Sequence, residues 1–213
     1  RAAVERGYFE ELEVDVIWLS PLNDNPEGRF LGRDGEEAEA YHGYWAKSPR
    51  DVENRFGTEA SLDALIEAAH ARGLRVLLDF APNHIHEQHP YVQNAPSDAW
   101  FNKPDGSCIC GFTCPWGENM RECWFDPFLP DLNWWNEDVS NAMLADMEYW
   151  YTRYKLDGLR VDAVPMMPRN AVRLLRNQLG EAVTGERPFL LGETFTHENG
   201  FNQIRYYLGP ESL

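Results

Sequence analysis

The chain has 213 residues, of which 43% are hydrophobic and 13% aromatic, and its formal net charge is −16 at pH 7. This apolar content is enough for one sizeable hydrophobic core. The negative charge argues against a nucleic-acid partner, which would require clustered Lys and Arg, and no apolar run approaches the roughly 20 residues of a membrane span. The opening residues 1–6 are typical of the middle of a helix, so we expect the natural N-terminus to lie upstream.

Strands and helices alternate along the sequence. A leading helix is predicted over residues 2–12, and β-rich apolar runs at 14–19, 74–80, 159–164 and 189–195 predict buried strands. Because helices separate these strands, the pattern predicts an α/β fold with a parallel sheet and right-handed crossovers. The sheet belongs either to a doubly wound fold or to a barrel. No glycine-rich nucleotide loop follows any strand, which disfavours a dinucleotide-binding, doubly wound fold.

Three further helices are predicted, over residues 58–73, 136–155 and 168–180, from apolar residues at helical spacing. Thr58, Asn136 and Pro168 favour their starts, and Gly73 and Gly180 favour the ends of the first and third. The buried stripes are Leu62, Leu65, Ile66 and Ala69; Val139, Met143, Met147, Trp150 and Tyr154; and Val172, Leu175 and Leu179.

One connection, residues 85–135, is too long for an ordinary loop and indicates a functional segment or small subdomain. It holds all four cysteines: Cys108, Cys110, Cys114 and Cys123. Their even number favours two disulfides in an exported, secreted or periplasmic protein, with three possible connectivities. A zinc site is the alternative, although the cysteine spacing is unusual for zinc. His86 and His89 would join such a site and are otherwise expected to be solvated loop residues.

Charged residues stand where the predicted strands end. Asp79, Arg160, Asp162 and Glu193 lie in or directly after strands, where they are costly unless paired. One explanation is a structural salt-bridge network. The other is a pair of carboxylates converging on one glycosidic bond, as glycoside hydrolysis requires. Arg160 points to the same side of its strand as Asp162 and can help to keep that carboxylate ionised.

Six motifs in order along the chain resemble those of the α-amylase superfamily, glycoside hydrolase family 13. They are the segments at residues 18–21 (WLSP), 41–45 (YHGYW), 79–84 (DFAPNH), 129–133 (LPDLN), 158–162 (GLRVD) and 192–195 (GETF). The resemblance implies a partial TIM (β/α)8 barrel, containing the second to fifth strands, with a loop-rich subdomain inserted after the third strand. The implied division is residues 1–84 for the first part of the barrel, 85–135 for the inserted calcium and disulfide subdomain, and 136–213 for the second, truncated part.

The resemblance also implies roles for individual residues. Asp162 matches the nucleophile and Glu193 the general acid/base. The matched substrate-binding residues are Tyr44, His42, Trp45, His84 and Arg160. Tyr44 would be an aromatic platform beneath the sugar, although core packing is the alternative for Tyr44 and Trp45.

The resemblance implies a structural calcium ion as well, held by Asn83 and Asp131 through oxygen ligands. Arg121 stands where some relatives have an acidic ligand. The third catalytic Asp of the family belongs to a His-Asp motif that this sequence does not contain, and the histidine of residues 196–199 (THEN) is not that motif. We therefore expect residues 1–213 alone to be inactive and poorly soluble.

The implied function is retaining hydrolysis of α-1,4-glucosidic bonds in starch-like glucans or maltooligosaccharides. Pro165 and Met166 stand where amylases often have a Lys-His pair, which is closer to trehalose synthases and other transferring members. Transglycosylation or trehalose-type isomerisation is therefore the alternative. A catalytically inactive binding relative is disfavoured, because both catalytic carboxylates are present.

Overall fold

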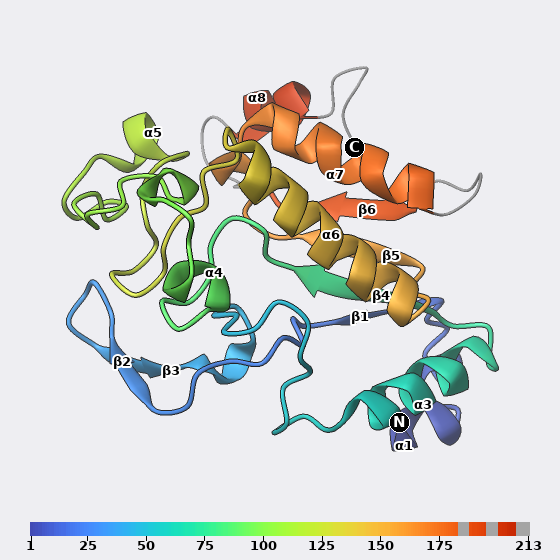
Figure 1. Cartoon of the computed structure of the whole chain (residues 1–213). Helices are drawn as coiled ribbons and strands as arrows, with labels where there is room; N and C mark the ends of the chain where they lie inside the picture. Colours follow the sequence, from blue (N-terminus) through green and yellow to red (C-terminus); the bar gives the residue numbers. More distant parts are fainter. Residues whose placement is uncertain (183–187, 195–199, 208–213) are drawn as a thin grey trace.

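The computed structural model describes residues 1–182, 188–194 and 200–207. Its centre is a parallel sheet with strand order β1-β4-β5-β6 (Figure 1). The strands are β1 (Val16–Leu19), β4 (Arg75–Phe80), β5 (Gly158–Val161) and β6 (Phe189–Gly192). Each strand therefore pairs with the next one along the sheet in chain order, with helices in the connections, as the alternating sequence pattern predicts.

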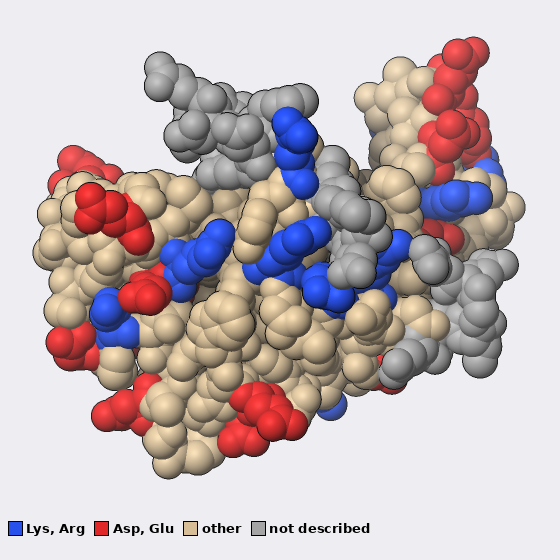
Figure 2. Space-filling view, turned by 90° about the horizontal axis from the view of Figure 1, so that it is seen from above, with Lys and Arg blue, Asp and Glu red and all other residues tan. Residues whose placement is uncertain are grey.

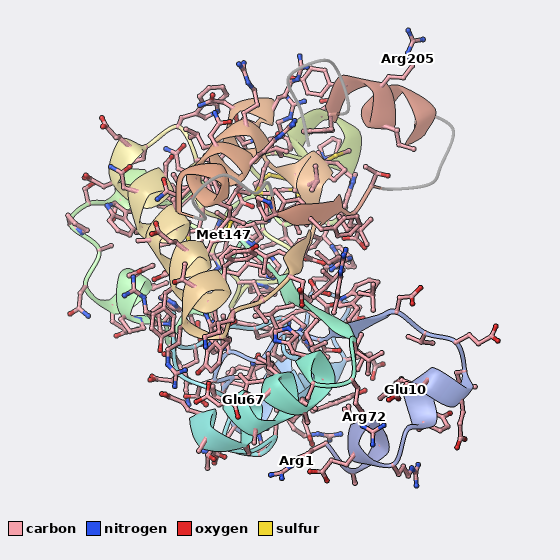
Figure 3. All side chains as sticks on the ribbon, turned by 90° about the vertical axis from the view of Figure 1, so that its right-hand side faces the viewer. Arg1, Glu10, Glu67, Arg72, Met147 and Arg205 are labelled. Atoms are coloured by element: carbon pink, nitrogen blue, oxygen red, sulfur yellow. A yellow bond between two sulfur atoms is a disulfide. The ribbon has the colours of Figure 1, made fainter. Side chains whose placement is uncertain are left out.

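Three long helices accompany the sheet: α3 (Glu59–His70), α6 (Glu137–Arg153) and α7 (Arg169–Ala182) (Figure 1). Their predicted apolar stripes pack with every second residue of the inner strands, among them Val76, Leu78, Leu159 and Val161, in one buried cluster. Met147 of α6 is completely buried and lies inside this layer (Figure 3). The hydrophobic core thus fills the space between the helices and one face of the sheet.

The other face of the sheet carries the charged residues. Trp18 bonds Asp79, and Asp79 pairs with Arg160 across the strands, so these side chains share that face. In β1 and β6, exposed and half-buried residues alternate, and Val16, Trp18, Phe189 and Leu191 are 40–56% exposed. The prediction that these two strands are buried was therefore wrong, because one of their faces has no covering layer among the described residues.

The leading helix is broken into α1 (Ala2–Glu5) and α2 (Tyr8–Glu11). Gly7 between them has φ +80°, in the left-handed region that interrupts a helix and that glycine adopts at little cost. The prediction of one continuous helix was wrong at this residue. Arg72, just beyond α3, bonds Glu10 with an Nη1–Oε1 distance of 2.7 Å, which ties this segment to the body of the protein (Figure 3).

The helix ends follow their sequence signals with one exception. Thr58 and Ser61 form a reciprocal capping box at the start of α3, and Asn136 caps α6 by accepting from the Asp138 N–H. Gly73, at φ +74°, donates to the His70 carbonyl, the closure predicted for a C′ glycine. However, α7 continues through Gly180 to Ala182, so the predicted end there was wrong.

A hairpin that the sequence reading missed follows β1. It consists of β2 (Arg29–Leu31) and β3 (Glu37–Glu39), paired antiparallel, and η1 (Ala40–His42) comes directly after it. The Asp34-Gly35 pair in the connection was the available signal: the Asp34 side chain accepts from the Glu36 N–H, and Gly35 has φ +82°.

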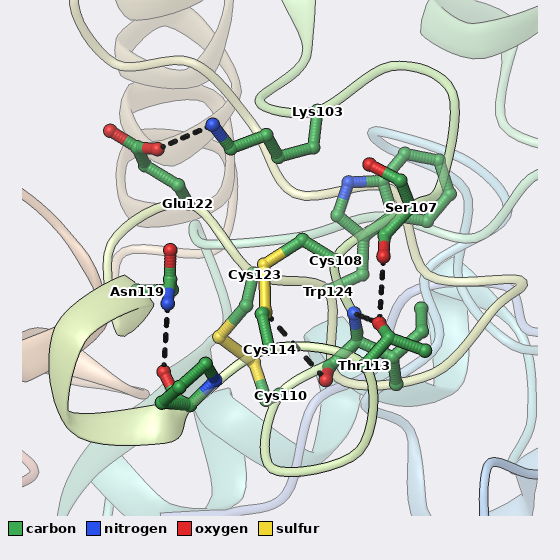
Figure 4. The surroundings of a disulfide bond; sticks show 12 residues. Lys103, Ser107, Cys108, Cys110, Thr113, Cys114, Asn119, Glu122, Cys123 and Trp124 are labelled. Carbon is green, nitrogen blue, oxygen red and sulfur yellow. Dashed lines mark hydrogen bonds and ion pairs between the residues drawn. A yellow bond between two sulfur atoms is a disulfide. The ribbon is translucent and has the colours of Figure 1, made fainter.

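The long connection contains only short helices: α4 (Pro90–Gln93), η2 (Asp98–Trp100) and α5 (Trp116–Asn119). Its cysteines pair as Cys108–Cys114 and Cys110–Cys123, which confirms the two predicted disulfides (Figure 4). His86 and His89 are buried at 0% and 2% exposure, so their predicted solvation was wrong. The His86 ring packs on the Phe30 and Phe128 rings, while His89 caps α4.

The remaining elements are η3 (Val164–Met166), which follows β5, and α8 (Gly200–Tyr207). Phe195, the last residue of the motif at 192–195, and residues 196–199 lie outside the described residues. None of the helices in the described ranges is long and apolar enough to cross a membrane. Seen from above, Lys and Arg gather across the middle of the surface with Asp and Glu mostly around them, so the net negative charge is unevenly spread (Figure 2).

Candidate active site

The candidate catalytic carboxylates follow two neighbouring strands. Asp162 comes directly after β5 and Glu193 directly after β6, and the last paired residues of these strands are Val161 and Gly192. The backbone N–H groups of Asp162 and Glu193 each donate to the preceding strand, at 2.9 Å to Phe80 O and Val161 O. The two residues therefore stand at the same level of the sheet, one strand apart.

Arg160 joins the acids of this edge through one guanidinium group. Its Nη1 donates to Asp79 Oδ1 at 2.8 Å and also to Asp162 Oδ1, and its Nη2 lies 2.7 Å from Glu193 Oε1. The Arg160 side chain is only 8% exposed. Three carboxylates thus share one buried positive charge, and the salt-bridge network expected as one explanation of these residues is present.

Burial dominates the electrostatics of Asp162. Burial, with smaller contributions from the Glu193 and Asp79 charges, raises the pKa of Asp162 to about 7. Arg160 lowers the pKa of Asp162, as the sequence analysis expected, but its charge is divided among three acids and does not outweigh burial. The fraction of Asp162 that is ionised therefore changes around neutral pH.

Asp79 is the buried anchor of the network. Besides Arg160, its Oδ2 accepts from Tyr44 Oη at 2.8 Å and Trp18 Nε1 at 3.2 Å. Burial raises the pKa of Asp79, and these three donors partly offset the effect. Trp18 was missed as a site residue, because only the tertiary structure brings its indole to Asp79; the Arg160 guanidinium also lies 5.3 Å from its ring.

Glu193 has a second fixed contact. Its Oε2 accepts from the Ala163 N–H at 3.0 Å. Ala163 has φ +51°, a left-handed conformation that is uncommon for a residue with a side chain. The backbone N–H of Ala163, which follows β5, therefore orients the side chain of Glu193, which follows β6.

Asp162 and Glu193 open onto a cleft. Its walls are formed by Tyr44, Trp45, His84, Phe125, Asp126, Leu129, Arg160, Asp162, Ala163 and Glu193. Four of the five predicted substrate-binding residues are among them. His42 is the exception: its ring stacks on Tyr44 with centroids 5.7 Å apart. Phe125 and Asp126 were not singled out from the sequence, whereas Leu129 belongs to the motif at residues 129–133.

The predicted substrate-binding residues differ in their surroundings. Trp45 is 7% exposed and packs in a cluster with Ala40, Phe128 and Leu129, so it also has the core-packing role considered for it. His84 Nε2 is 3.1 Å from Tyr44 O, and its buried Nδ1 has no hydrogen-bond partner among the described residues. Burial lowers the pKa of His84 to about 4, so its ring is neutral at pH 7.

The predicted metal ligands form a separate oxygen-rich cluster. Asn83 Nδ2 donates to Asp131 Oδ1 at 2.9 Å, and Asn102 Nδ2 donates to Asp131 Oδ2 at 2.8 Å and to Arg121 O at 3.2 Å. Asp131 is 1% exposed, and burial raises its pKa well above the usual value. No group of three or more His, Cys, Asp or Glu that could hold a metal occurs in the described ranges. With the Asn side chains turned, however, amide, carboxylate and carbonyl oxygens would all face the centre, which suits a hard cation.

Comparisons with known proteins identify the family of the chain. The family model of the alpha-amylase catalytic domain matches residues 5–206. An alpha-glucosidase of Apis mellifera is 30% identical, with 94% of this chain and 37% of that protein covered. A cyclomaltodextrin glucanotransferase of Geobacillus stearothermophilus is 28% identical, with 98% of this chain and 30% of that protein covered.

The fold is also similar to solved structures. The crystal structure of an alpha-amylase from Geobacillus thermoleovorans, complexed with acarbose, matches with a TM-score of 0.75 and 27% identity, covering 92% of this chain and 39% of that one. The chain spans about a third of the length of the curated relatives named above. The parallel strands with their intervening helices form part of a TIM barrel, as predicted. The chain thus belongs to the alpha-amylase family, glycoside hydrolase family 13, with part of its catalytic barrel.

Proposed function

We propose that the protein containing this chain is a retaining glycoside hydrolase that cleaves α-1,4-glucosidic bonds of starch-like glucans or maltooligosaccharides. The observation that carries the proposal is the placement of Asp162 and Glu193. They stand at the ends of neighbouring strands, both contact the Arg160 guanidinium, and both line one cleft. Neighbouring strands lie roughly 4.8 Å apart, close to the roughly 5–5.5 Å between the carboxyl groups of retaining enzymes.

In this mechanism ionised Asp162 attacks the anomeric carbon while Glu193 protonates the departing glycosidic oxygen. A bond from Asp162 to the sugar forms as the glycosidic bond breaks. Glu193, now ionised, then takes a proton from water, which attacks the same carbon and releases Asp162. The Ala163 N–H supports this exchange because its hydrogen bond to Oε2 fixes the orientation of the Glu193 carboxyl group.

The cleft walls supply binding. Tyr44 offers an aromatic surface for an apolar face of the sugar ring, with its hydroxyl held by Asp79. Neutral His84 also lines the cleft, and its buried Nδ1 has no hydrogen-bond partner among the described residues. His42 acts through Tyr44, on which it stacks, and Trp45 closes the wall behind them.

The decisive experiment follows the anomeric form of the first product by proton NMR, using the complete protein and maltotetraose. The α-anomer is expected, and initial release of the β-anomer would contradict retention. Glu193→Gln should lower kcat about 10²–10⁴-fold. Glu122→Gln is the matched control, because this exposed glutamate contacts Lys103 and lies outside the cleft.

Glycosyl transfer is the second candidate. It is favoured by Pro165 and Met166, which are buried and follow Asp162 in the sequence, where a Lys-His pair is common in amylases. One relative is named a glucanotransferase. In this case a sugar hydroxyl replaces water as the acceptor. It belongs to another oligosaccharide in a transglycosylase and to the released glucose in a trehalose-synthase-type isomerase. Products longer than maltotetraose, or trehalose from maltose, would identify such a reaction.

The proposal includes a structural calcium ion, which would be held by Asn83 and Asp131, with Asn102 and the Arg121 carbonyl completing an oxygen set. In this division, residues 85–135 form the calcium and disulfide subdomain between barrel parts 1–84 and 136–213. The two disulfides support a secreted or periplasmic protein.

A further inference from the structure

One wall of the cleft holds an acid and an aromatic ring that the proposed chemistry does not use. Phe125 and Asp126 lie just beyond the second disulfide, which ends at Cys123, and both are half-buried. They line the same cleft as Asp162 and Glu193. A half-buried carboxylate loses part of its hydration, which a hydrogen bond from the protein or from a ligand can replace.

Only one oxygen of Asp126 has a hydrogen-bond partner among the described residues. Oδ1 accepts from the Arg33 N–H at 2.7 Å, and a Cβ atom on Gly32 would lie 3.4 Å from it, so the turn of the β2–β3 hairpin fits against this oxygen. Oδ2 has no hydrogen bond or ion pair within the described ranges. The carboxylate is thus held in one orientation by Oδ1, and Oδ2 is available to accept a hydrogen bond from a ligand.

Arg33 is itself clamped to the disulfide loop. Its Nη1 donates to Cys110 O at 2.8 Å, and its guanidinium lies 5.4 Å from the Phe112 ring and 5.8 Å from the Trp116 ring. The Arg33 side chain thus ties its own backbone, whose N–H orients Asp126, to the disulfide-linked segment 77 residues further along the chain.

The neighbouring ring is also fixed. The Phe125 ring packs edge-on against His84, with centroids 5.0 Å apart, and at a tilt against Trp116, with centroids 5.8 Å apart. An aromatic surface beside a carboxylate suits a pyranose, because the ring contacts the apolar C–H groups and the carboxylate accepts from a hydroxyl. Both groups are preorganised, which reduces the entropy lost on binding.

We propose that Phe125 and Asp126 form a sugar-binding subsite, in which Asp126 Oδ2 accepts a hydroxyl of an oligosaccharide bound in the cleft. Asp126 is then a specificity-determining residue, and Arg33 is a positioning residue that acts through it. The inference rests on the proposed function, since it assumes a sugar substrate. It adds an acceptor and a platform to the residues already matched to substrate binding.

The test compares Asp126→Ala and Asp126→Asn in the complete protein, using maltotriose to maltoheptaose. Loss of a hydrogen bond to a charged group should raise KM about tenfold for substrates that reach the subsite, with kcat within about twofold. Asp126→Asn keeps the shape and should have the smaller effect. Glu37→Gln is the matched control, because it removes an exposed carboxylate from the β2–β3 hairpin and lies outside the cleft.

Arg33→Ala tests the positioning role. The backbone N–H remains, whereas the clamp to the disulfide loop is lost, so KM should rise less than in Asp126→Ala and kcat should stay unchanged. If KM is unaltered for every substrate in both Asp126 variants, the subsite is overturned. An equal fall of kcat for all substrates, together with a lower unfolding midpoint, would instead assign Asp126 a structural role and also overturn it.

A wild-type protein without activity on α-glucans would contradict the proposed function but would leave the subsite testable. The dissociation constant of maltoheptaose is then measured by calorimetry for the wild type and the variants. About tenfold weaker binding in Asp126→Ala supports the subsite, and equal binding in all variants overturns it.

Discussion

Replacing Asp79 by Asn should shift the pH dependence of catalysis without touching either proposed catalytic carboxylate. Asp79 and Asp162 bond the same Arg160 nitrogen, and the Asp79 charge raises the pKa of Asp162. The substitution removes that charge, and the Arg160 guanidinium then pairs with two carboxylates, Asp162 and Glu193, in place of three. Both changes favour ionised Asp162, so its pKa should fall.

The magnitude follows from the geometry. Charges roughly 5 Å apart at an effective dielectric constant of about 20 interact by about 3 kcal/mol, which corresponds to about two pKa units as an upper bound. Because the pKa of Asp162 is about 7, we expect kcat/KM of the wild type to decline as the pH falls through this value. In Asp79→Asn this decline of kcat/KM should occur at a pH about one to two units lower.

The assay is kcat/KM on a maltooligosaccharide between pH 4 and pH 9, since this ratio reports the ionisations of the free enzyme. Asp146→Asn is the matched control: Asp146 is equally buried and bonds an arginine and a tyrosine, Arg50 and Tyr91, but lies outside the Arg160 network. If kcat/KM of Asp79→Asn declines at the same pH as in the wild type, or at a higher pH, the decline does not report the ionisation of Asp162.

Three other predictions concern stability. Reduction of the two disulfides, which close short loops of sequence separation 6 and 13, should destabilise their segment by about 2–3 kcal/mol per bridge, measured by thermal unfolding with and without reductant. Chelation of calcium should lower the unfolding midpoint of the complete protein, and Asp131→Ala should abolish this response; an equal midpoint in chelator and in calcium would contradict the site. Gly158→Ala should destabilise by about 1–3 kcal/mol or more, because its Cβ would lie 2.1 Å from Phe189 O of the next strand, whereas Gly117→Ala, with open space around it, should not.

Local periodicity was sufficient for much of the fold. The strand positions, the caps at Thr58 and Asn136 and the C′ glycine Gly73 follow from patterns that a few neighbouring residues complete. The broken leading helix is a different case, because apolar spacing continues across Gly7 and only its backbone conformation interrupts the helix. Burial of individual strands was not predictable, because it depends on which layers cover the sheet.

The candidate site was predictable where its residues stand at strand ends in recognisable motifs, as Asp162 and Glu193 do. The sharing of Arg160 among three acids was not, since strand order and pairing decide which carboxylates meet. Trp18 and Asp126 reach the site through tertiary contacts that leave no periodic trace. The burial of His86 likewise depends on Phe30, from the hairpin that was missed.

The pairing of the cysteines has a consequence for limited proteolysis. The turn between Cys110 and Cys114 is exposed, and Phe112 at its tip is 57% exposed, which is the kind of site where proteases nick folded proteins. A cut after Phe112 would put Cys108 and Cys110 on one fragment and Cys114 and Cys123 on the other. Both bridges would then join the fragments, so a nicked molecule would migrate as one chain in a non-reducing gel and separate only after reduction.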